Sequence, residues 1–576
     1  MASILPFIVF IVSVVGMLFC MIRSPQLPVP KSIVKRGHIH VDSVVPPLIG
    51  VIILLISGEM SFREMWNGGV VGDDKIKPYA IIIIFNALAY ICVSLDATGC
   101  LTYISLKVAK AAGSSRKRLF VYFFLLSAAL TAVTSNDIVI MTLTPVVLQC
   151  AKFTGTAPWA YLFAEFIAAN TTSFALVIGN PTNIIVADAF NINFAEFSKI
   201  MVVPALFTTA LEGLVLYWLF SRDLEGTFVP PDLHPEEMLL DPLGSKVHGV
   251  ILGICVIFMG VSSAIPDIKL WMVAACCCVF SIIYNVYAYP WSSEEAEARE
   301  AAIARISEAA QDGTAPAPVG ASDDDTEVVT QTSNIASEAA SVPATIYSPP
   351  ANDVATINGR SSVEIYHDSV SSSQSHRDLS LNPNSPIETM NLDHDHKIAR
   401  QPVKPTIKAG IKALPWGLIP FVFSMFVLVQ GLNNGGWVDK IAEACVSAMG
   451  GKGSINSASA PQFVPALFMM FVTCIFCNLL NNQPATVLIT RVLLAPPFQA
   501  LKRKAQLGAA YAVIAGSNLA ASLTLVGALA GIMFIQLLKL HGRPMTYSQF
   551  ALVGLKVVPF VALCCCVVVS AFIFAA

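Results

Sequence analysis

Clusters of small polar residues interrupt long apolar segments at four places in the chain. The residues predicted to bind a solute or ion are Ser135, Asn136, Asp137, Asn170, Thr171, Thr172, Gly179, Asn180, Pro181, Thr182, Asn183, Asn481, Asn482, Gln483, Pro484, Thr486, Ser517, Asn518 and Gly527. Their amides and hydroxyls can hydrogen bond a small polar solute. Unpaired polar groups are costly in lipid, so the clusters predict a binding site enclosed by protein within the membrane.

Asp137 is the acid that belongs to one of these clusters, at Thr134-Ser135-Asn136-Asp137. An ionisable residue in an apolar segment is a functional hypothesis by default, and this carboxyl could carry a coupling proton. The alternative is a helix cap. Asp96, near the end of an apolar run, and Glu165, just before Asn170, are the further coupling candidates. At the corresponding cluster of the second half stands Gln483, which suggests a single coupling charge.

The elements that must hold these clusters are membrane-spanning helices. The sequence is 55% hydrophobic and 13% charged, whereas soluble domains carry about 25% charged residues. Apolar runs recur along the chain with nearly the length of about 20 residues that crosses a bilayer. The run before Arg23 lacks the basic start of a cleavable signal and is predicted to be a first span. The chain is therefore predicted to be an all-α, multi-pass integral membrane protein.

Two kinds of interrupted segment are predicted. Segments 119–150 and 463–490 hold polar residues midway, and each arm is short for a full crossing, which favours a re-entrant hairpin. The alternative is two spans joined by a turn at the surface. Segments 159–187 and 505–540 contain Gly, and the first also Pro, within spanning length, which predicts broken helices. Their unwound turns would free backbone groups, and their half-helix ends would add dipoles. The alternative for the first is a plain proline kink.

The spacing of these motifs predicts two repeated halves. Asn170 and Gly179 are nine residues apart, as are Asn518 and Gly527. An odd number of crossings per half would invert the second half, as in many transporters. The predicted division is a first half at 1–246, the start of the second half at 247–292, a linker at 293–410 and the rest of the second half at 411–576.

The linker at 293–410 is rich in acidic residues, Ser and Pro, which predicts disorder. The distribution of Lys and Arg in short loops assigns it to the cytoplasm. No phosphate-binding loop motif is found, so ATP-driven transport, and an enzyme, are not expected. We expect no nucleic-acid module, cofactor or metal site; Cys474 and Cys477 form a lone pair in an apolar segment, which favours packing over ligation.

The four clusters resemble those of the ion transporter superfamily, most closely its arsenite permeases and silicic-acid exporters. The matching stretches are Thr134-Ser135-Asn136-Asp137, Ile178-Gly179-Asn180-Pro181-Thr182-Asn183, Asn481-Asn482-Gln483-Pro484-Ala485-Thr486 and Gly516-Ser517-Asn518. Sodium-coupled dicarboxylate carriers of this superfamily have hairpin tips that look like Ser-Asn-Thr. Asp137 and Gln483 depart from that pattern. Related sodium/proton antiporters also place an Asp in a hairpin, so that function stays open.

The resemblance implies an elevator-type fold and export of a small inorganic oxyacid, arsenite, antimonite or silicic acid, by proton antiport. The expected partners are this solute, H⁺ or Na⁺, and the lipid bilayer, with a homodimer common in the superfamily. The alternatives are a carboxylate or anion carrier, a Na⁺/H⁺ antiporter, and a channel or receptor-like protein. The sequence leaves the membrane open between the plasma membrane and an internal one.

Overall fold

The computed structural model describes residues 3–575 apart from one long stretch, 302–404, and several short ones. The short stretches are residues 24, 29–37, 73–75, 154–155, 229–234, 263, 266, 296, 299–300, 413, 415, 456–462, 541–542 and 544. Most of the predicted linker at 293–410 therefore lies outside the described residues.

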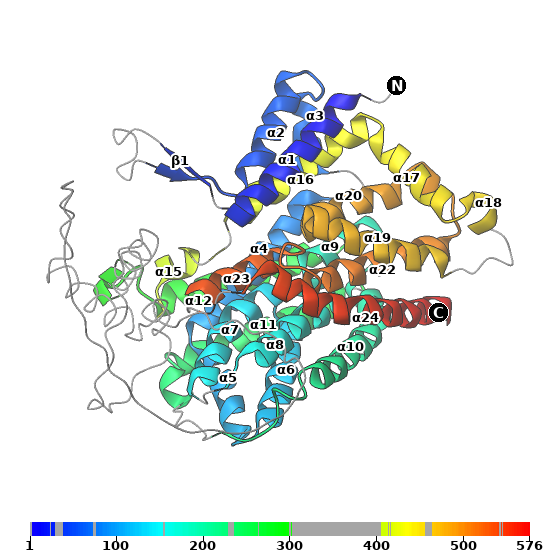
Figure 1. The fold of residues 1–576 in the computed structure, drawn as a ribbon. Coiled ribbons are helices and arrows are strands. Elements are labelled where there is room, and N and C mark those ends of the chain that lie inside the picture. Colours follow the sequence, from blue (N-terminus) through cyan, green and yellow to red (C-terminus); the bar gives the residue numbers. More distant parts are fainter. Residues whose placement is uncertain are drawn as a thin grey trace, which may run out of the picture.

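The described part of the chain is almost entirely helical (Figure 1). The first half contains α1 (Ile4–Arg23), α2 (Val45–Ile56), α3 (Phe62–Trp66), η1 (Asn67–Val71), α4 (Pro78–Ala97), α5 (Cys100–Ala111), α6 (Arg116–Val133), α7 (Asn136–Phe153), α8 (Trp159–Thr172), η2 (Val177–Gly179), α9 (Pro181–Ala189), α10 (Phe194–Leu219) and η3 (Pro235–Met238). A short antiparallel pair, β1 (Gln26–Pro28) and β2 (His38–His40), follows α1.

The second half runs to the end of the described chain. It contains α11 (Pro242–Ser262), α12 (Leu270–Ala288), α15 (Ile407–Lys412), α16 (Leu418–Asn434), α17 (Trp437–Ala448), α18 (Gly451–Ile455), α19 (Val464–Leu480), α20 (Asn482–Leu494), α21 (Pro496–Gln499), α22 (Arg503–Leu519), η4 (Ala520–Ser522), α23 (Leu529–Leu540) and α24 (Tyr547–Ala575).

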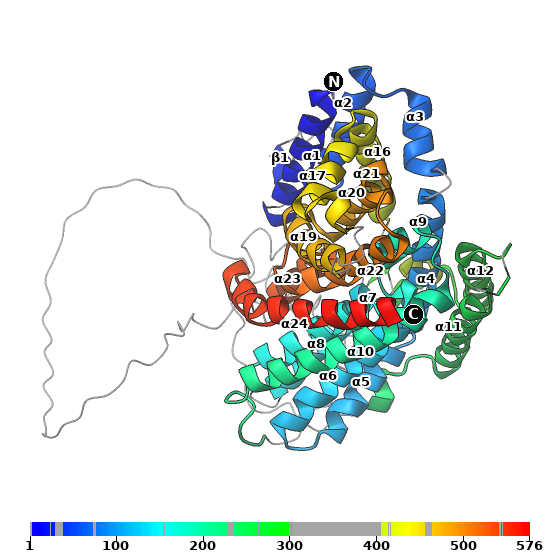
Figure 2. The ribbon, with the colours of Figure 1, turned by 90° about the vertical axis from the view of Figure 1, so that its right-hand side faces the viewer.

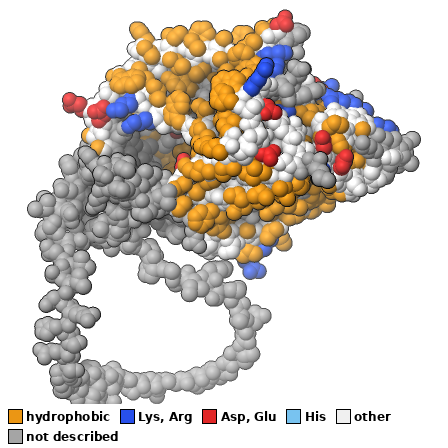
Figure 3. All heavy atoms as spheres, turned by 90° about the horizontal axis from the view of Figure 1, so that it is seen from above, with side chains coloured by type: hydrophobic (Ala, Val, Ile, Leu, Met, Phe, Trp, Pro, Cys, Tyr) orange, Lys and Arg blue, Asp and Glu red, His pale blue; other side chains and the backbone are white. Residues whose placement is uncertain are grey.

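Helices α4, α10, α11, α12 and α24 are long and apolar enough to cross a membrane. Several shorter helices, among them α2, α7, α16 and α19, are also apolar. Large apolar side chains on α1, α2, α11 and α24 are exposed on the outside of the protein, and Figure 3 shows hydrophobic side chains over much of one face. An apolar exterior around a packed core is what a lipid environment requires.

Corresponding helices of the two halves pack in corresponding pairs. Helix α6 packs on α8 as α19 packs on α22, and α7 packs on α23 as α20 packs on α9. Helices α10 and α24 pack on each other, and each contains a proline, Pro204 or Pro559. Helix α4 packs on α11 and α12, whereas α16 packs on α1 and α2 (Figure 2). Each half thus contributes one helix to a three-helix group of the other half.

The sequence-based division missed two short helices. Helix α5 lies between α4 and α6, and α17 lies between α16 and α19. Each has 12 residues, and α5 carries Lys107 and Lys110. Both were overlooked because they are short and contain polar residues, so neither forms an apolar run of membrane-spanning length. Each packs on one arm of a hairpin, α5 on α7 and α17 on α20.

A buried polar network ties α11 and α12 to α4. Asn285 Oδ1 on α12 accepts a hydrogen bond from His248 Nε2 on α11 at 2.8 Å. Its amide nitrogen donates to Tyr90 Oη and Ser94 Oγ on α4, both at 2.9 Å. His248 also bonds Ser281 through Nδ1 at 3.1 Å. Asn285 is therefore the residue through which the second half's first two helices bond to the first half's α4.

Substituting Asn285→Leu is expected to destabilise the protein by about 2–4 kcal/mol, because each buried polar group left unpaired costs about 1–3 kcal/mol. The measurement is thermal unfolding of the purified protein in detergent. Asn86→Leu on α4 is the matched control, since the Asn86 amide donates only within its own helix, to the Ile82 carbonyl. Equal stability losses in the two variants would contradict a bridging role for Asn285.

Candidate functional site

The first hairpin tip lies between α6 and α7. Thr134 ends α6 by donating to the Leu130 carbonyl at 2.7 Å, and α7 begins at Asn136. Asn136 Nδ2 donates to Asn170 Oδ1 at 2.9 Å, and Asn170 Nδ2 donates to the Phe166 carbonyl at 2.8 Å. The carbonyl fixes the orientation of Asn170, which in turn fixes that of Asn136. Asn136 Oδ1 is left buried, with no hydrogen-bond donor in the part of the chain that the structure describes.

The second hairpin tip lies between α19 and α20. Asn481 has a positive φ of 69°, which turns the chain sharply, and its amide donates to the Val526 carbonyl at 3.1 Å. The next two residues, Asn482 and Gln483, are 3% and 5% exposed. Their side-chain oxygens have no hydrogen-bond donor among the described residues. Both tips therefore present buried amide oxygens that need a donor or a cation.

The two broken helices are α8–η2–α9 and α22–η4–α23, and side chains at their breaks form one dense hydrogen-bond network. Asn518, at the end of α22, donates to Asn183 Oδ1 at 2.8 Å and accepts from Asn180 Nδ2 at 2.9 Å. Its oxygen also accepts from the Ser173 hydroxyl. Ser517 Oγ donates to Thr182 Oγ1 at 3.1 Å. Residues more than 330 positions apart thus join the halves directly at their breaks.

This network gives several of the predicted binding residues a structural role. Asn170, Asn180, Asn183 and Asn518 use their amides to bond one another and the backbone. In the arrangement described, these side chains hold the two breaks together. Among the described residues, the amide oxygens of the predicted set that have no donor belong instead to the two tips, at Asn136, Asn482 and Gln483. The predicted polar set therefore divides into a framework at the two breaks and two tips with unpaired, buried amide oxygens.

Glycine is required at both breaks because the backbone approaches itself closely. A Cβ on Gly179 would collide with the Ser173 carbonyl, and a Cβ on Gly527 would collide with the Ala520 carbonyl. Pro181 follows at the first position of α9 and Pro484 lies in the first turn of α20, where the missing N–H costs no helix bond. These residues shape the breaks and the tip rather than offering side-chain groups to a solute.

The remaining predicted hydroxyls have varied surroundings. Thr172 bonds Thr209 of α10 at 3.1 Å, and Thr486 donates to the Asn482 carbonyl within α20 at 2.7 Å. The Thr171 hydroxyl is buried and has no hydrogen-bond partner among the described residues. Ser135, at the first tip, is half-buried and lines a pocket.

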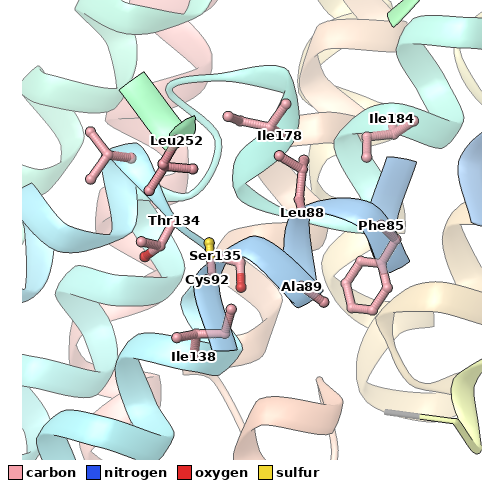
Figure 4. Close-up of a pocket in the computed structure, with 11 residues that line it drawn as sticks. Phe85, Leu88, Ala89, Cys92, Thr134, Ser135, Ile138, Ile178, Ile184 and Leu252 are labelled. Atoms are coloured by element: carbon pink, nitrogen blue, oxygen red, sulfur yellow. The ribbon is translucent and has the colours of Figure 1, made fainter. Parts of the chain in front are cut away.

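That pocket lies between the first tip and α4 (Figure 4). Its wall consists mainly of apolar side chains, among them Leu88 and Ala89 of α4, Ile178 of η2 and Ile184 of α9. Thr134 and Ser135 supply its polar groups. No Lys or Arg lines it. A pocket of this composition accommodates a small uncharged solute better than a multiply charged anion, which needs cationic donors.

The acids predicted for coupling occupy separate places. Asp137 is half-buried in the first turn of α7. Asp96, in the last turn of α4, faces the Thr142 hydroxyl of α7. Glu165 on α8 is fully buried, and one of its oxygens accepts from Thr144 Oγ1 at 2.8 Å. Its other oxygen has no hydrogen-bond partner among the residues described. Asp96 and Glu165 thus contact α7 at two positions beyond the tip that are two residues apart, Thr142 and Thr144.

The sequence analysis overlooked a further acid in an apolar segment, Glu212 on α10, which is 0% exposed. It stands in an apolar segment, so the criterion applied to Asp137 would have found it. Among the described residues, no group of three His, Cys, Asp or Glu side chains converges as a metal ion would require.

Comparison with known proteins defines the class. The citrate transporter family model (CitMHS) matches residues 5–314, and the arsenical pump membrane protein model (ArsB) matches residues 396–574. The protein is thus an integral, multi-pass membrane transporter. Since the first match covers more than half of the chain, the chain belongs to the citrate transporter (CitMHS) family of the ion transporter superfamily, and its C-terminal part resembles the arsenite permeases.

Individual relatives match over part of their length. An arsenical pump membrane protein of Escherichia coli is 27% identical over 211 residues, which are 35% of this chain and 47% of that protein. One of Yersinia enterocolitica is 28% identical over 172 residues, 29% of this chain and 40% of that protein. The chain therefore spans less than half the length of these curated relatives.

Two solved structures align with almost the whole chain at 12% identity. They are Neisseria gonorrhoeae MtrF, with a TM-score of 0.44 and 99% and 95% of the two chains covered, and the Alcanivorax borkumensis YdaH transporter, with a TM-score of 0.46 and 99% and 98% covered. These TM-scores are too low to carry an inference about this chain.

Proposed function

We propose that this protein is a secondary transporter that exports a small inorganic oxyacid, such as arsenous or silicic acid, in exchange for protons. The observation that carries the proposal is the pair of tips with buried amide oxygens at Asn136, Asn482 and Gln483 that lack donors. The hydroxyl groups of a neutral oxyacid are hydrogen-bond donors and match these acceptors. The arsenical pump relatives agree with this class of substrate.

The paired packing of the two halves supports an elevator-type movement. The hairpins and broken helices pack on one another across the halves through α7 with α23 and α20 with α9. They can form one moving unit, while the three-helix groups of α1, α2 and α16 and of α4, α11 and α12 form a scaffold. Inverted repeats of this kind give alternating access by moving one part against the other. A dimer through the scaffold belongs to the same proposal.

A carboxylate carrier is the second candidate, because the citrate transporter model covers the first half. A citrate anion would need positively charged or N–H donors in a buried site. The tips instead present oxygens, and no Lys or Arg lines the pocket beside the first tip. The arrangement therefore favours the neutral oxyacid.

The test is uptake by the purified protein in liposomes, with arsenous acid, silicic acid, borate, citrate, sulfate and chloride offered in turn. Each is measured with a proton gradient, with a Na⁺ gradient and with neither. We expect saturable accumulation of arsenous or silicic acid that depends on the proton gradient, and none of citrate. Accumulation of citrate would establish the second candidate. Large flux that ignores both gradients would indicate a channel and contradict the proposal.

A further inference from the structure

The buried carboxyl of Glu212 lies apart from both hairpin tips. Glu212 belongs to α10, which packs on both α8 and α24. The residue is 0% exposed, and neither carboxyl oxygen has a hydrogen-bond partner within the described part of the chain. Leaving a carboxyl group unpaired at such a position is costly in either protonation state. The position therefore needs a counterpart that none of the described residues supplies in hydrogen-bonding geometry.

One polar group faces this carboxyl from the neighbouring helix. The Thr171 hydroxyl of α8 is also buried and unpaired, and it lies opposite Glu212 without reaching hydrogen-bond geometry. The other nearby hydroxyls are occupied, because Thr208 donates to the Pro204 carbonyl and Thr209 bonds Thr172. Three oxygen atoms, two from Glu212 and one from Thr171, thus lie together without partners.

The titratable groups around Glu212 do not neutralise it. Helix α24 presents the thiol of Cys565, which is neutral when protonated. On α8, Glu165 precedes Thr171 by six residues, and its carboxylate accepts a hydrogen bond from Thr144. On α11, His248 is engaged with Asn285 and Ser281. From α6, the Phe124 ring packs at Gly213, beside Glu212. No basic side chain of the described residues acts on the Glu212 carboxyl.

We propose that Glu212 and Thr171 form a binding site for a single small monovalent cation, either a proton or Na⁺. A proton on Glu212 would provide a donor for the Thr171 oxygen. A Na⁺ ion would be coordinated by the carboxylate and the hydroxyl, both of them hard oxygen ligands. In either case one positive charge compensates the buried carboxylate and gives the three oxygens a partner.

The proposed cation site lies next in sequence to Asn170, the residue that orients Asn136 at the first hairpin tip. Thr171 follows Asn170 in α8, and Asn170 accepts the hydrogen bond from Asn136 at the tip. Thr172, the next residue, bonds α10 through Thr209. Binding or loss of the cation changes the contact between α8 and α10 next to the residue that orients Asn136. Its part in transport rests on the proposed function, whereas occupancy of the site does not.

The experiment measures cation binding without transport. The purified protein in detergent is heated in NaCl and in choline chloride of equal concentration, and its Tm is recorded. In parallel, infrared spectra across a pH series record the C=O stretch of protonated carboxyl groups. The variants are Glu212→Gln and Thr171→Val. Thr208→Val is the matched control, because it removes a hydroxyl one turn from Glu212 that donates to the Pro204 carbonyl of its own helix.

If the site binds Na⁺, NaCl raises the Tm of the wild type and of Thr208→Val, by mass action on the folded state. The increase is lost in Glu212→Gln and reduced in Thr171→Val. If it binds a proton, Na⁺ has no effect, and a protonated carboxyl band that disappears as pH rises is absent from Glu212→Gln. Both outcomes support the site and distinguish its ligand.

The proposal is overturned if the wild type responds to neither cation, with equal Tm in both salts and no carboxyl band that changes with pH. This readout needs only the wild type, so it holds even if Glu212→Gln fails to fold. It is also independent of the substrate. A cation site in a protein that moves no oxyacid would contradict the proposed function alone, and oxyacid export without a cation response would contradict this site alone.

Discussion

Asn518→Leu is expected to abolish solute exchange and to lower the free energy of unfolding by about 2–6 kcal/mol. Asn518 joins the two broken helices through Asn183 and Asn180, at 2.8 and 2.9 Å. Leucine has the same branched arrangement of four side-chain heavy atoms but no polar group, so it leaves the Asn183 oxygen and an Asn180 N–H buried and unpaired. Each such group costs about 1–3 kcal/mol. The measurements are unfolding in detergent and solute exchange in liposomes.

Asn482→Leu is the matched control for this prediction. Asn482 is also a buried asparagine, 3% exposed, but its side-chain oxygen has no hydrogen-bond donor among the described residues. Its loss is expected to weaken solute binding and to leave the stability close to that of the wild type. If Asn518→Leu unfolds at the wild-type temperature while exchange is lost, Asn518 binds the solute and does not link the halves.

The contrast between these two asparagines shows what the sequence could and could not predict. Both were recognisable as functional candidates, because an amide in an apolar segment must find a partner inside the protein. Their roles depend on which residues lie opposite them in space. Asn518 bonds Asn183, which is 335 positions away in the sequence. A local sequence pattern cannot predict which distant residue will lie opposite. Residue type and spacing therefore predicted the positions of the clusters but not their division into framework and tips.

The helices show the same limit. The breaks near Gly179 and Gly527 were predictable because glycine stands inside spanning segments, and the structure adds the reason, a close approach of the backbone to itself. Helices α5 and α17 were missed because they are short and partly polar. Their existence depends on packing against α7 and α20, which is a tertiary contact. Glu212 was missed only because its segment looked like an ordinary span.

Asp137→Asn is expected to preserve solute exchange and to remove accumulation driven by a proton gradient. Asp137 stands in the first turn of α7, where Gln483 occupies the corresponding position of α20. Asparagine keeps the shape and hydrogen bonding of the side chain but cannot gain or lose the proton. With one proton exchanged per solute molecule, a gradient of one pH unit drives about tenfold accumulation, and this should fall to about onefold in the variant.

The two functions of Asp137, proton coupling and helix capping, are separated by measuring two fluxes in the same liposomes. One is accumulation against an imposed pH gradient, and the other is exchange of labelled solute without a gradient. Glu196→Gln is the matched control, since Glu196 is an exposed acid in the first turn of α10; it should retain both fluxes. Since asparagine caps a helix as well as aspartate does, a capping role predicts that Asp137→Asn also retains both. Full gradient-driven accumulation in Asp137→Asn would therefore contradict the coupling role and transfer it to Glu165 or Asp96.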